Sequence, residues 1–234
     1  MIEIKNVTKK YGSKVAVKDV SFNVEDGEIF AFIGHNGAGK TTLIKSIVGI
    51  HDFDEGDIII NGKSIKEDPI ACKKEMAYVP DNPELYENMK AIDFIDFICD
   101  MYDVSIEERE KNISKYAKLF EIENNLNDTI NSFSHGMKQK IAVISALAHN
   151  PKILIMDEPF VGLDPKAVYD IKEIMNEMIR EGKTIFFSTH ILDVAEKLCS
   201  RVAIIKNGEL IKVGSMKQIK GDKSLEKVFL ELEG

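Results

Sequence analysis

Residues 29–50 read IFAFIGHNGAGKTTLIKSIVGI, and this stretch decides the fold. The apolar run 29–33 predicts a buried strand, and the segment 41–50 predicts a helix with apolar side chains on its inner face. Between them, residues 34–41 match G-x-x-x-x-G-K-[ST], the phosphate-binding loop. A glycine-rich turn without a ligand is the alternative. The strand before the loop and the helix after it are the context that the phosphate loop requires, so the sequence favours that motif.

The residue types of this loop suit a phosphate chain. Glycines allow backbone N–H groups to turn inward, and the helix N-terminus adds the positive end of its dipole. Lys40 can reach the β- and γ-phosphates, and the Thr41 hydroxyl can bind Mg²⁺. The residues expected to hold the phosphates are Gly34, Asn36, Gly37, Ala38, Gly39, Lys40, Thr41 and Thr42.

Strand patterns flank the loop on both sides. Residues 1–30 alternate short strand patterns with turns, and residues 58–63 predict a hairpin that turns at Asn61-Gly62. Further buried strands are predicted at 76–79, 153–156 and 184–188, and a terminal hairpin is predicted around Asn207-Gly208. Strands that alternate with helices predict a parallel sheet with its ligand at the carboxyl edge.

Residues 84–150 differ in character, because apolar residues recur there at helical spacing. Ser105 and Glu108 have the spacing of a capping box at one helix start. We therefore expect an α/β fold in one domain, residues 1–234. A phosphate-loop core with a parallel sheet and an N-terminal antiparallel β subdomain takes 1–83 and 151–234, and a helical insert takes about 84–150.

A second chemical cluster follows the apolar strand 153–156, where Asp157 and Glu158 stand together. Two solvated acids that cap a strand are the alternative. A strand end beside a phosphate loop is where a Mg²⁺ partner belongs, so Asp157 is expected to serve the metal. Glu158 points differently and could orient or deprotonate an attacking water.

His190 follows the buried strand 184–188. A histidine at a strand's carboxyl end can donate to a γ-phosphate and stabilise charge during transfer. Its alternative role is to cap the next helix.

Composition limits the possible functions. The formal net charge is −8, which disfavours a general nucleic-acid binder. The three cysteines share no short spacing, so they predict neither a metal motif nor a disulfide framework, and a reducing cytosol suits them. We expect no signal peptide, and no stretch approaches the roughly 20 apolar residues that span a bilayer. Any action at a membrane would need another chain.

With these residues in view, the chain resembles the nucleotide-binding subunit of an ABC transporter. Tyr11 resembles the aromatic residue that stacks on adenine in that family, and residues 131–140 (NSFSHGMKQK) resemble its signature sequence. Residues 161–164 resemble the loop that crosses between subunits, and 188–190 resemble the switch-histidine motif. These elements occur in the family's order over almost the whole length.

The resemblance implies a mechanism that needs two such subunits, either two copies or this chain with a related partner. Each ATP, with Mg²⁺, would lie between one phosphate loop and the signature of the facing subunit. ATP would close the dimer and hydrolysis would release it. Beyond the phosphate loop, the residues implied at the nucleotide are Tyr11, Val17, Ser134, Gly136 and Asp164.

Two residues depart from the family pattern. His135 replaces the first glycine of the signature, and Asp81 stands where the family has a glutamine that senses Mg²⁺ and links to the membrane partner. Asp81 is expected at the metal, or else as a turn residue after Pro80. The segment 81–98 is expected to receive a helix of the permease with some of its apolar residues; in the alternative, all of them pack the insert's own core.

The leading interpretation is an ATP-hydrolysing subunit, peripheral on the inner face of the cell membrane, that powers a separate polytopic permease. The short chain and the variant signature favour a bacterial exporter. A soluble ABC ATPase that acts on nucleic acid or ribosomes is the alternative, but no coiled coil, tandem cassette or basic segment supports it, and no nucleic-acid partner is expected. A binding module with little turnover is a third possibility, which Glu158 and His190 disfavour.

Overall fold

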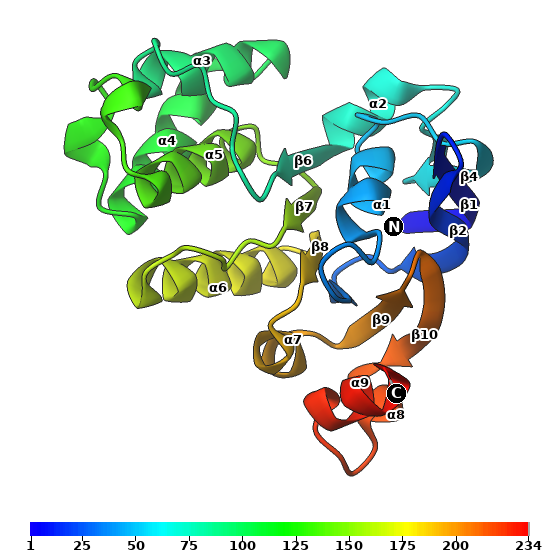
Figure 1. The fold of residues 1–234 in the computed structure, drawn as a ribbon. Helices are drawn as coiled ribbons and strands as arrows, with labels where there is room; N and C mark the ends of the chain where they lie inside the picture. The colour runs from blue at the N-terminus through cyan, green and yellow to red at the C-terminus, as the bar shows by residue number, and fades with distance from the viewer. Residues whose placement is uncertain (234) are drawn as a thin grey trace.

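A mixed six-stranded sheet forms the centre of the molecule in the computed structural model, which describes residues 1–233 (Figure 1). Its strand order is β10-β9-β3-β8-β7-β6, and all neighbouring strands are parallel except β10 and β9. The predicted parallel sheet is therefore confirmed, with an antiparallel edge strand added. The strands are β3 (Ile29–Ile33), β6 (Met76–Val79), β7 (Ile153–Asp157), β8 (Thr184–Thr189), β9 (Arg201–Lys206) and β10 (Glu209–Ser215).

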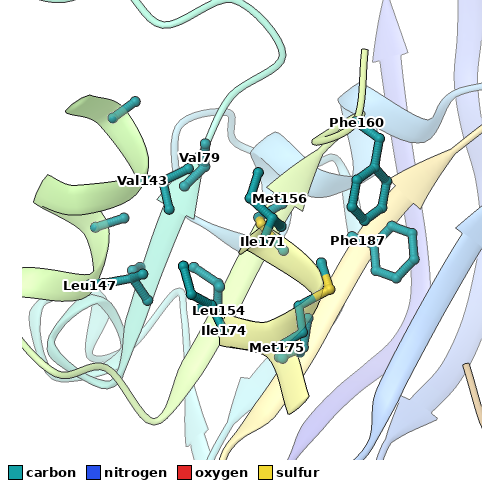
Figure 2. Close-up of a cluster of buried hydrophobic side chains, with 14 of the residues drawn as sticks. Val79, Val143, Leu147, Leu154, Met156, Phe160, Ile171, Ile174, Met175 and Phe187 are labelled. Carbon is teal, nitrogen blue, oxygen red and sulfur yellow. The ribbon is translucent and has the colours of Figure 1, made fainter. Parts of the chain in front are cut away.

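Alternation along the strands divides the core into two clusters. In β3, Phe30 and Phe32 face the first cluster, while Ala31 and Ile33 face the second. Because β3 is covered on both faces, it reads as an uninterrupted apolar run. Figure 2 shows the second cluster, where β7 and β8 meet the helices α5 (His135–Ala148) and α6 (Pro165–Arg180).

A second, antiparallel sheet of order β2-β1-β4-β5 covers the first cluster. It confirms the predicted N-terminal β subdomain and the hairpin at Asn61-Gly62. The helix α1 (Lys40–Ile47) lies against this cluster and ends three residues before the predicted limit. The strands of this sheet are β1 (Ile2–Tyr11), β2 (Lys14–Val24), β4 (Glu55–Ile60) and β5 (Lys63–Ser64).

The helical insert lies between β6 and β7 and consists of α3 (Ala91–Met101), α4 (Ile106–Leu119) and α5, with short 3₁₀ turns at Glu123–Asn125 and Ile130–Ser132. Its apolar residues join the same cluster as those of β6 and β7, so its core is continuous with the sheet. The prediction of a capping box at Ser105 is confirmed in part. The Ser105 hydroxyl accepts from Glu108 N, but a return bond from the Glu108 side chain is not seen among the described residues.

Three shorter helices and a C-terminal helix complete the described chain. The sequence prediction missed α2 (Pro69–Glu75), which Asp68 caps by accepting from Ala71 N. The C-terminal helix is α9 (Leu225–Glu233), and α7 (Leu192–Leu198) and α8 (Met216–Lys220) precede it. Gly234, the last residue of the predicted domain, lies outside the described residues. Within residues 1–233, no helix has the length and apolar character needed to cross a membrane.

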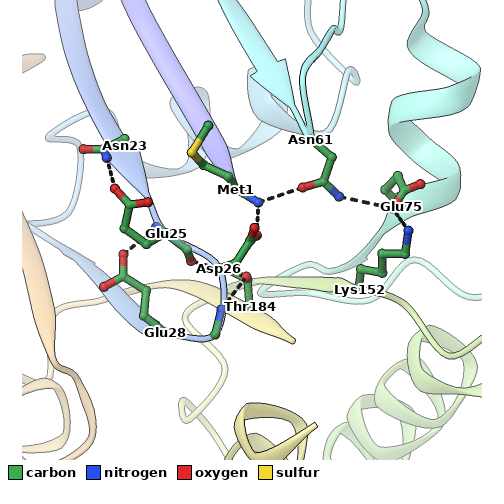
Figure 3. Close-up of polar contacts among 10 residues, drawn as sticks. Met1, Asn23, Glu25, Asp26, Glu28, Asn61, Glu75, Lys152 and Thr184 are labelled. Carbon is green, nitrogen blue, oxygen red and sulfur yellow. Dashed lines mark hydrogen bonds and ion pairs between the residues drawn. The ribbon is translucent and has the colours of Figure 1, made fainter. Parts of the chain in front are cut away.

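Polar contacts tie the sheets together at the amino edge of the parallel strands (Figure 3). The backbone amide of Gly27 donates to Thr184 Oγ1, and Lys152 pairs with Glu75 at 2.9 Å. The hydrogen bond from Lys152 is the main reason that the pKa of Glu75 is lowered. These contacts join the segments at the starts of β3 and β8 and at the starts of β6 and β7.

Candidate active site

The carboxyl ends of three neighbouring strands bring the predicted chemistry to one edge of the sheet. Ile33 at the end of β3 pairs with Thr189, and Asp157 at the end of β7 pairs with Ser188. The phosphate loop, the acidic pair and His190 are therefore adjacent. A cavity of about 530 Å³ opens here. It is lined by Tyr11, Lys14, Val15, Ala16, Asn36, Gly37, Gly39, Lys40, Thr41, Thr42, Asp81, Glu158, Asn207 and Gly208.

The phosphate loop is packed so closely that two of its glycines have no room for a side chain. A Cβ on Gly34 would lie 2.6 Å from the carbonyl oxygen of Ile205, and one on Gly39 would lie 2.5 Å from that of Ala16. Gly39 also has a φ of +109°, which few other residues adopt. The loop is thus held in its turn by the backbones of β9 and β2.

Lys40 lies almost fully inside this loop. Its ammonium donates to the carbonyl oxygens of Gly34 at 2.7 Å and His35 at 3.2 Å. It also lies 3.1 Å from Glu158 Oε1, with only 6% of its side chain exposed. A buried cation therefore lines the cavity, where an anionic ligand can pair with it.

Glu158 connects the phosphate loop to the switch histidine. One carboxylate oxygen pairs with Lys40, and the other lies 2.9 Å from His190 Nδ1 and accepts from the His190 backbone amide at 3.2 Å. Its φ of +49° is unusual for a residue other than glycine, and Ser188 Oγ holds its backbone amide at 3.0 Å. Backbone strain of this kind is concentrated at functional sites. His190 does not cap α7, whose N-cap is Ile191.

Asp157 is suited to a hard cation. Its side chain is buried; Oδ1 accepts from Ser188 Oγ, and Oδ2 has no hydrogen-bond partner among the described residues. An orphaned carboxylate oxygen at this depth fits a Mg²⁺ that binds through the oxygen or through a water. Within residues 1–233, no three His, Cys, Asp or Glu side chains converge to form a metal cage. Mg²⁺ in nucleotide sites uses one or two carboxylates with waters and phosphates, so the residues present fit it.

Asp81 faces the same acidic groups. It lines the cavity, and its pKa is raised, first by partial burial and then by the negative charges of Asp157 and Glu158. His135 and His190 oppose that shift through their charges. The carboxylate that replaces the family's glutamine therefore lies within electrostatic reach of the predicted metal residues.

The adenine side of the cavity matches the prediction only in part. Tyr11 lines it with 46% of the residue exposed, and Lys9 Nζ lies 5.2 Å from the ring centroid. Val17 is fully buried and does not line the cavity; its neighbours Val15 and Ala16 do.

The turn at Asn207 and Gly208 was predicted, but the sequence prediction missed that it lines the cavity at the end of β9. The backbone amide of Gly208 donates to the Ala38 carbonyl of the phosphate loop at 2.9 Å. The Asn-Gly signal predicted the turn, but only the pairing of β9 with β3 brings it to the loop.

The signature residues lie away from this cavity in the same chain. Ser134 and Gly136 do not line it, nor does Asp164. Ser134 caps α5 by accepting from Met137 N, and Asp164 caps α6 by accepting from Ala167 N. His135 lies against the crossing loop, since a Cβ on Gly162 would be 3.3 Å from its ring.

Comparison with known proteins agrees with this geometry. The family model described as ABC transporter matches residues 17–161, more than half of the chain. The chain belongs to the ABC transporter family. The ATP-binding protein EcsA of Bacillus subtilis (strain 168) is 36% identical over 237 aligned positions, which cover 99% of this chain and 96% of EcsA.

Two solved structures are also similar to this subunit. An ATP-binding subunit of an ABC transporter has a TM-score of 0.96 at 35% identity, with full coverage of both chains. A dimeric ATP-binding cassette, MJ0796, bound to ADP and phosphate has a TM-score of 0.83 at 29% identity and covers 92% of this chain and 99% of its own. The prediction of an ATPase subunit that powers transport is thereby confirmed, and nothing found favours the nucleic-acid alternative.

Proposed function

We propose that Glu158 is the general base for ATP hydrolysis and that its contacts with Lys40 and His190 organise the reaction. Lys40 and Glu158 line the cavity of the phosphate loop, and His190, which does not line it, contacts Glu158 from beside it. The phosphates bind to the loop amides and Lys40, Thr42 supports them, and Tyr11 stacks on adenine, with Val15 and Ala16 beside it in place of Val17. Glu158 orients the attacking water and takes its proton as the water adds to the γ-phosphorus.

His190 keeps the Glu158 carboxylate in place. A carboxylate only accepts hydrogen bonds, so Nδ1 carries the hydrogen in this contact. Nε2 can then donate to the γ-phosphate only when the ring is doubly protonated. In that form His190 both holds the base and stabilises charge on the transferred group.

Thr41 and Asp157 would hold Mg²⁺, and Asp81 would approach it from the segment after β6. The ion supplies charge neutralisation for the phosphates. The orphaned Oδ2 of Asp157 is the observation that supports this assignment.

The active site is completed by a second subunit, identical or related. Ser134 and Gly136 lie outside the cavity of their own chain, at the N-terminus of α5, where backbone amides can receive a γ-phosphate. Asp164 lies in the segment proposed to cross between subunits. The dimeric cassette MJ0796 shows that a subunit of this fold can pair.

The permease contacts a patch formed by Tyr86, Phe97 and Met101, and this contact places the subunit at the inner face of the membrane. These residues are 59%, 40% and 62% exposed. Tyr86 makes edge contacts with Phe97 and with the buried Phe94, so the patch is attached to the core of the insert. An adjacent groove of about 240 Å³ runs between β6 and α3. Such a surface fits an amphipathic helix.

The Glu158→Gln substitution tests the proposal. It preserves shape and removes the base, so we expect Mg-ATP to bind, phosphate release to fall at least 100-fold, and ATP to convert the variant to a stable dimer on a sizing column. Glu177→Gln, an exposed acid on α6, serves as the control and should hydrolyse ATP normally. Normal turnover by Glu158→Gln would refute the assignment.

A further inference from the structure

The second residue of the phosphate loop, His35, is held from outside the loop. Inside the loop its carbonyl oxygen accepts from Ala38 N at 3.1 Å and from Lys40 Nζ at 3.2 Å. Its ring extends to the C-terminal helix α9, where the ring of Phe229 lies edge-on at a centroid distance of 4.9 Å. One residue thus connects the lysine of the loop with a helix nearly 200 positions later in the chain.

The helix α9 is a firm support for this contact. Leu225, Val228 and Phe229 are buried in the cluster that covers one face of the central sheet. At the start of the helix, the Leu225 backbone amide donates to Glu196 of α7 at 2.7 Å. Phe229 is therefore fixed by packing on its own side, and the His35 ring meets an ordered surface.

A second contact connects α9 to the same loop. Lys206, the last residue of β9, donates to the carbonyl oxygen of Leu232 at 3.0 Å. The next two residues form the turn in which Gly208 N donates to the Ala38 carbonyl. The helix is thus joined to the phosphate loop at His35 directly and at Ala38 through the end of β9.

We propose that Phe229 is a positioning residue for ATP binding, which acts through His35 to hold the phosphate loop in its binding conformation. The inference rests on the proposed role of the loop as the phosphate site. A loop that is ordered before binding loses less conformational entropy when the phosphates arrive. Loss of the aromatic contact therefore raises the dissociation constant of the nucleotide and leaves the chemistry at Glu158 unchanged.

The experiment measures Mg-ADP binding by isothermal titration calorimetry, together with the KM and kcat of ATP hydrolysis. Phe229→Leu retains an apolar side chain in the cluster but lacks the ring edge that meets His35. We expect its dissociation constant and KM to rise about 3- to 10-fold, while kcat stays within about 2-fold. Leu230→Ala, on the exposed face of the same helix, is the control and should match the wild type.

A double-mutant cycle with His35→Ala separates this role from simple support of the fold. If Phe229 acts through His35, each single variant weakens binding, and the double variant is no weaker than His35→Ala alone. Additive losses, or wild-type affinity in Phe229→Leu, would overturn the inference. Thermal midpoints of all variants identify any loss of folding, and Phe229→Tyr, which keeps the ring, should restore affinity.

Lys40→Ala distinguishes failure of this inference from failure of the proposed function. If Lys40→Ala loses Mg-ADP and Phe229→Leu does not, the loop binds phosphate without help from α9, and the inference is wrong. If Lys40→Ala itself binds Mg-ADP normally, the phosphate site is wrong, and the inference is overturned with it.

Discussion

The Nζ atom of Lys40 lies 3.1 Å from Oε1 of Glu158, so the cation of the phosphate loop and the acid after β7 form one buried ion pair. Only 6% of the lysine side chain and 11% of the glutamate side chain are exposed. The phosphates that bind this loop are also anions, and they compete with Glu158 for the same ammonium. We therefore expect nucleotide binding to be coupled to the position of Glu158 through Lys40.

The first prediction concerns the stability of this pair. Glu158→Gln leaves a buried ammonium without its anion, which should lower the free energy of unfolding without nucleotide by about 1–3 kcal/mol. ATP should then stabilise the variant more than the wild type, because the phosphates replace the missing charge. Urea unfolding with and without ATP measures both effects. Lys115 and Glu177 form an exposed pair, and Glu177→Gln should change stability by less than about 1 kcal/mol.

The second prediction concerns Lys40 itself. Lys40→Ala removes a charge-assisted contact to the phosphates that is worth about 1.5–3 kcal/mol. The dissociation constant of Mg-ATP should therefore rise about 10- to 100-fold. Lys45→Ala, on the same helix but outside the cavity, should bind normally. An equal effect in the two variants, measured by calorimetry, would contradict a specific phosphate contact.

The third prediction concerns Asp81, which lies within the electrostatic reach of Asp157 and Glu158. Without Mg²⁺, its carboxylate repels the phosphates; with Mg²⁺, it attracts the ion. Asp81→Gln should therefore bind ATP in EDTA several-fold better than the wild type and change less in excess Mg²⁺. Glu84→Gln removes a nearby acid that does not line this cavity and is the control. If the ratio of the two affinities is unchanged in Asp81→Gln, the residue does not face the metal.

The fourth prediction concerns the permease patch. Tyr86→Glu places a charge on an exposed aromatic residue whose ring meets Phe94 and Phe97 edge-on. The isolated subunit should keep its basal ATPase activity and thermal midpoint, while a polytopic membrane protein that co-purifies with the wild type from detergent extracts should be lost. Tyr169→Glu, on an exposed face of α6, is the control. Retained co-purification in Tyr86→Glu would place the contact elsewhere.

Local signals in the sequence were sufficient to predict the central strands and the phosphate loop. The strands β3, β7 and β8 are buried along their whole length and therefore read as apolar runs. The loop needs glycines where the backbones of Ile205 and Ala16 come within about 2.6 Å of the missing side chain. The helix α2 was missed because it is short, although Asp68 followed by Pro69 is a helix-start signal.

The parts that could not be predicted depend on contacts between distant segments. Gly208 reaches Ala38 because β9 pairs with β3 in the folded sheet. Phe229 reaches His35 because α9 packs into the same cluster as the end of β3. Val17 was expected at the nucleotide, but it is buried in the core, while Val15 lines the cavity. Regular alternation would place both on one face, but the pairing of β2 with β1 shifts register between these two positions. Which face of β2 meets the loop depends on that packing and not on the residue type.

The last prediction concerns stability in acid, through His149 at the end of α5. Its ring stacks on Tyr102 at a centroid distance of 3.7 Å, and burial lowers its pKa to about 4 from an ordinary 6.5. The unfolded chain therefore binds a proton between pH 6.5 and pH 4 that the folded protein does not. Stability is complete above pH 6.5 and falls as the pH decreases through this window.

Between pH 7.5 and pH 5.0, His149 should account for a loss of about 2 kcal/mol in the free energy of unfolding. His149→Phe keeps the stacked ring and cannot titrate, so its stability should fall by about 2 kcal/mol less than that of the wild type over this range. Urea unfolding at the two pH values measures the free energy of unfolding of each protein. The contribution of the carboxylates is common to both proteins and cancels when the two losses are compared. Equal losses in the two proteins would show that His149 is protonated as readily in the folded state as in the unfolded chain.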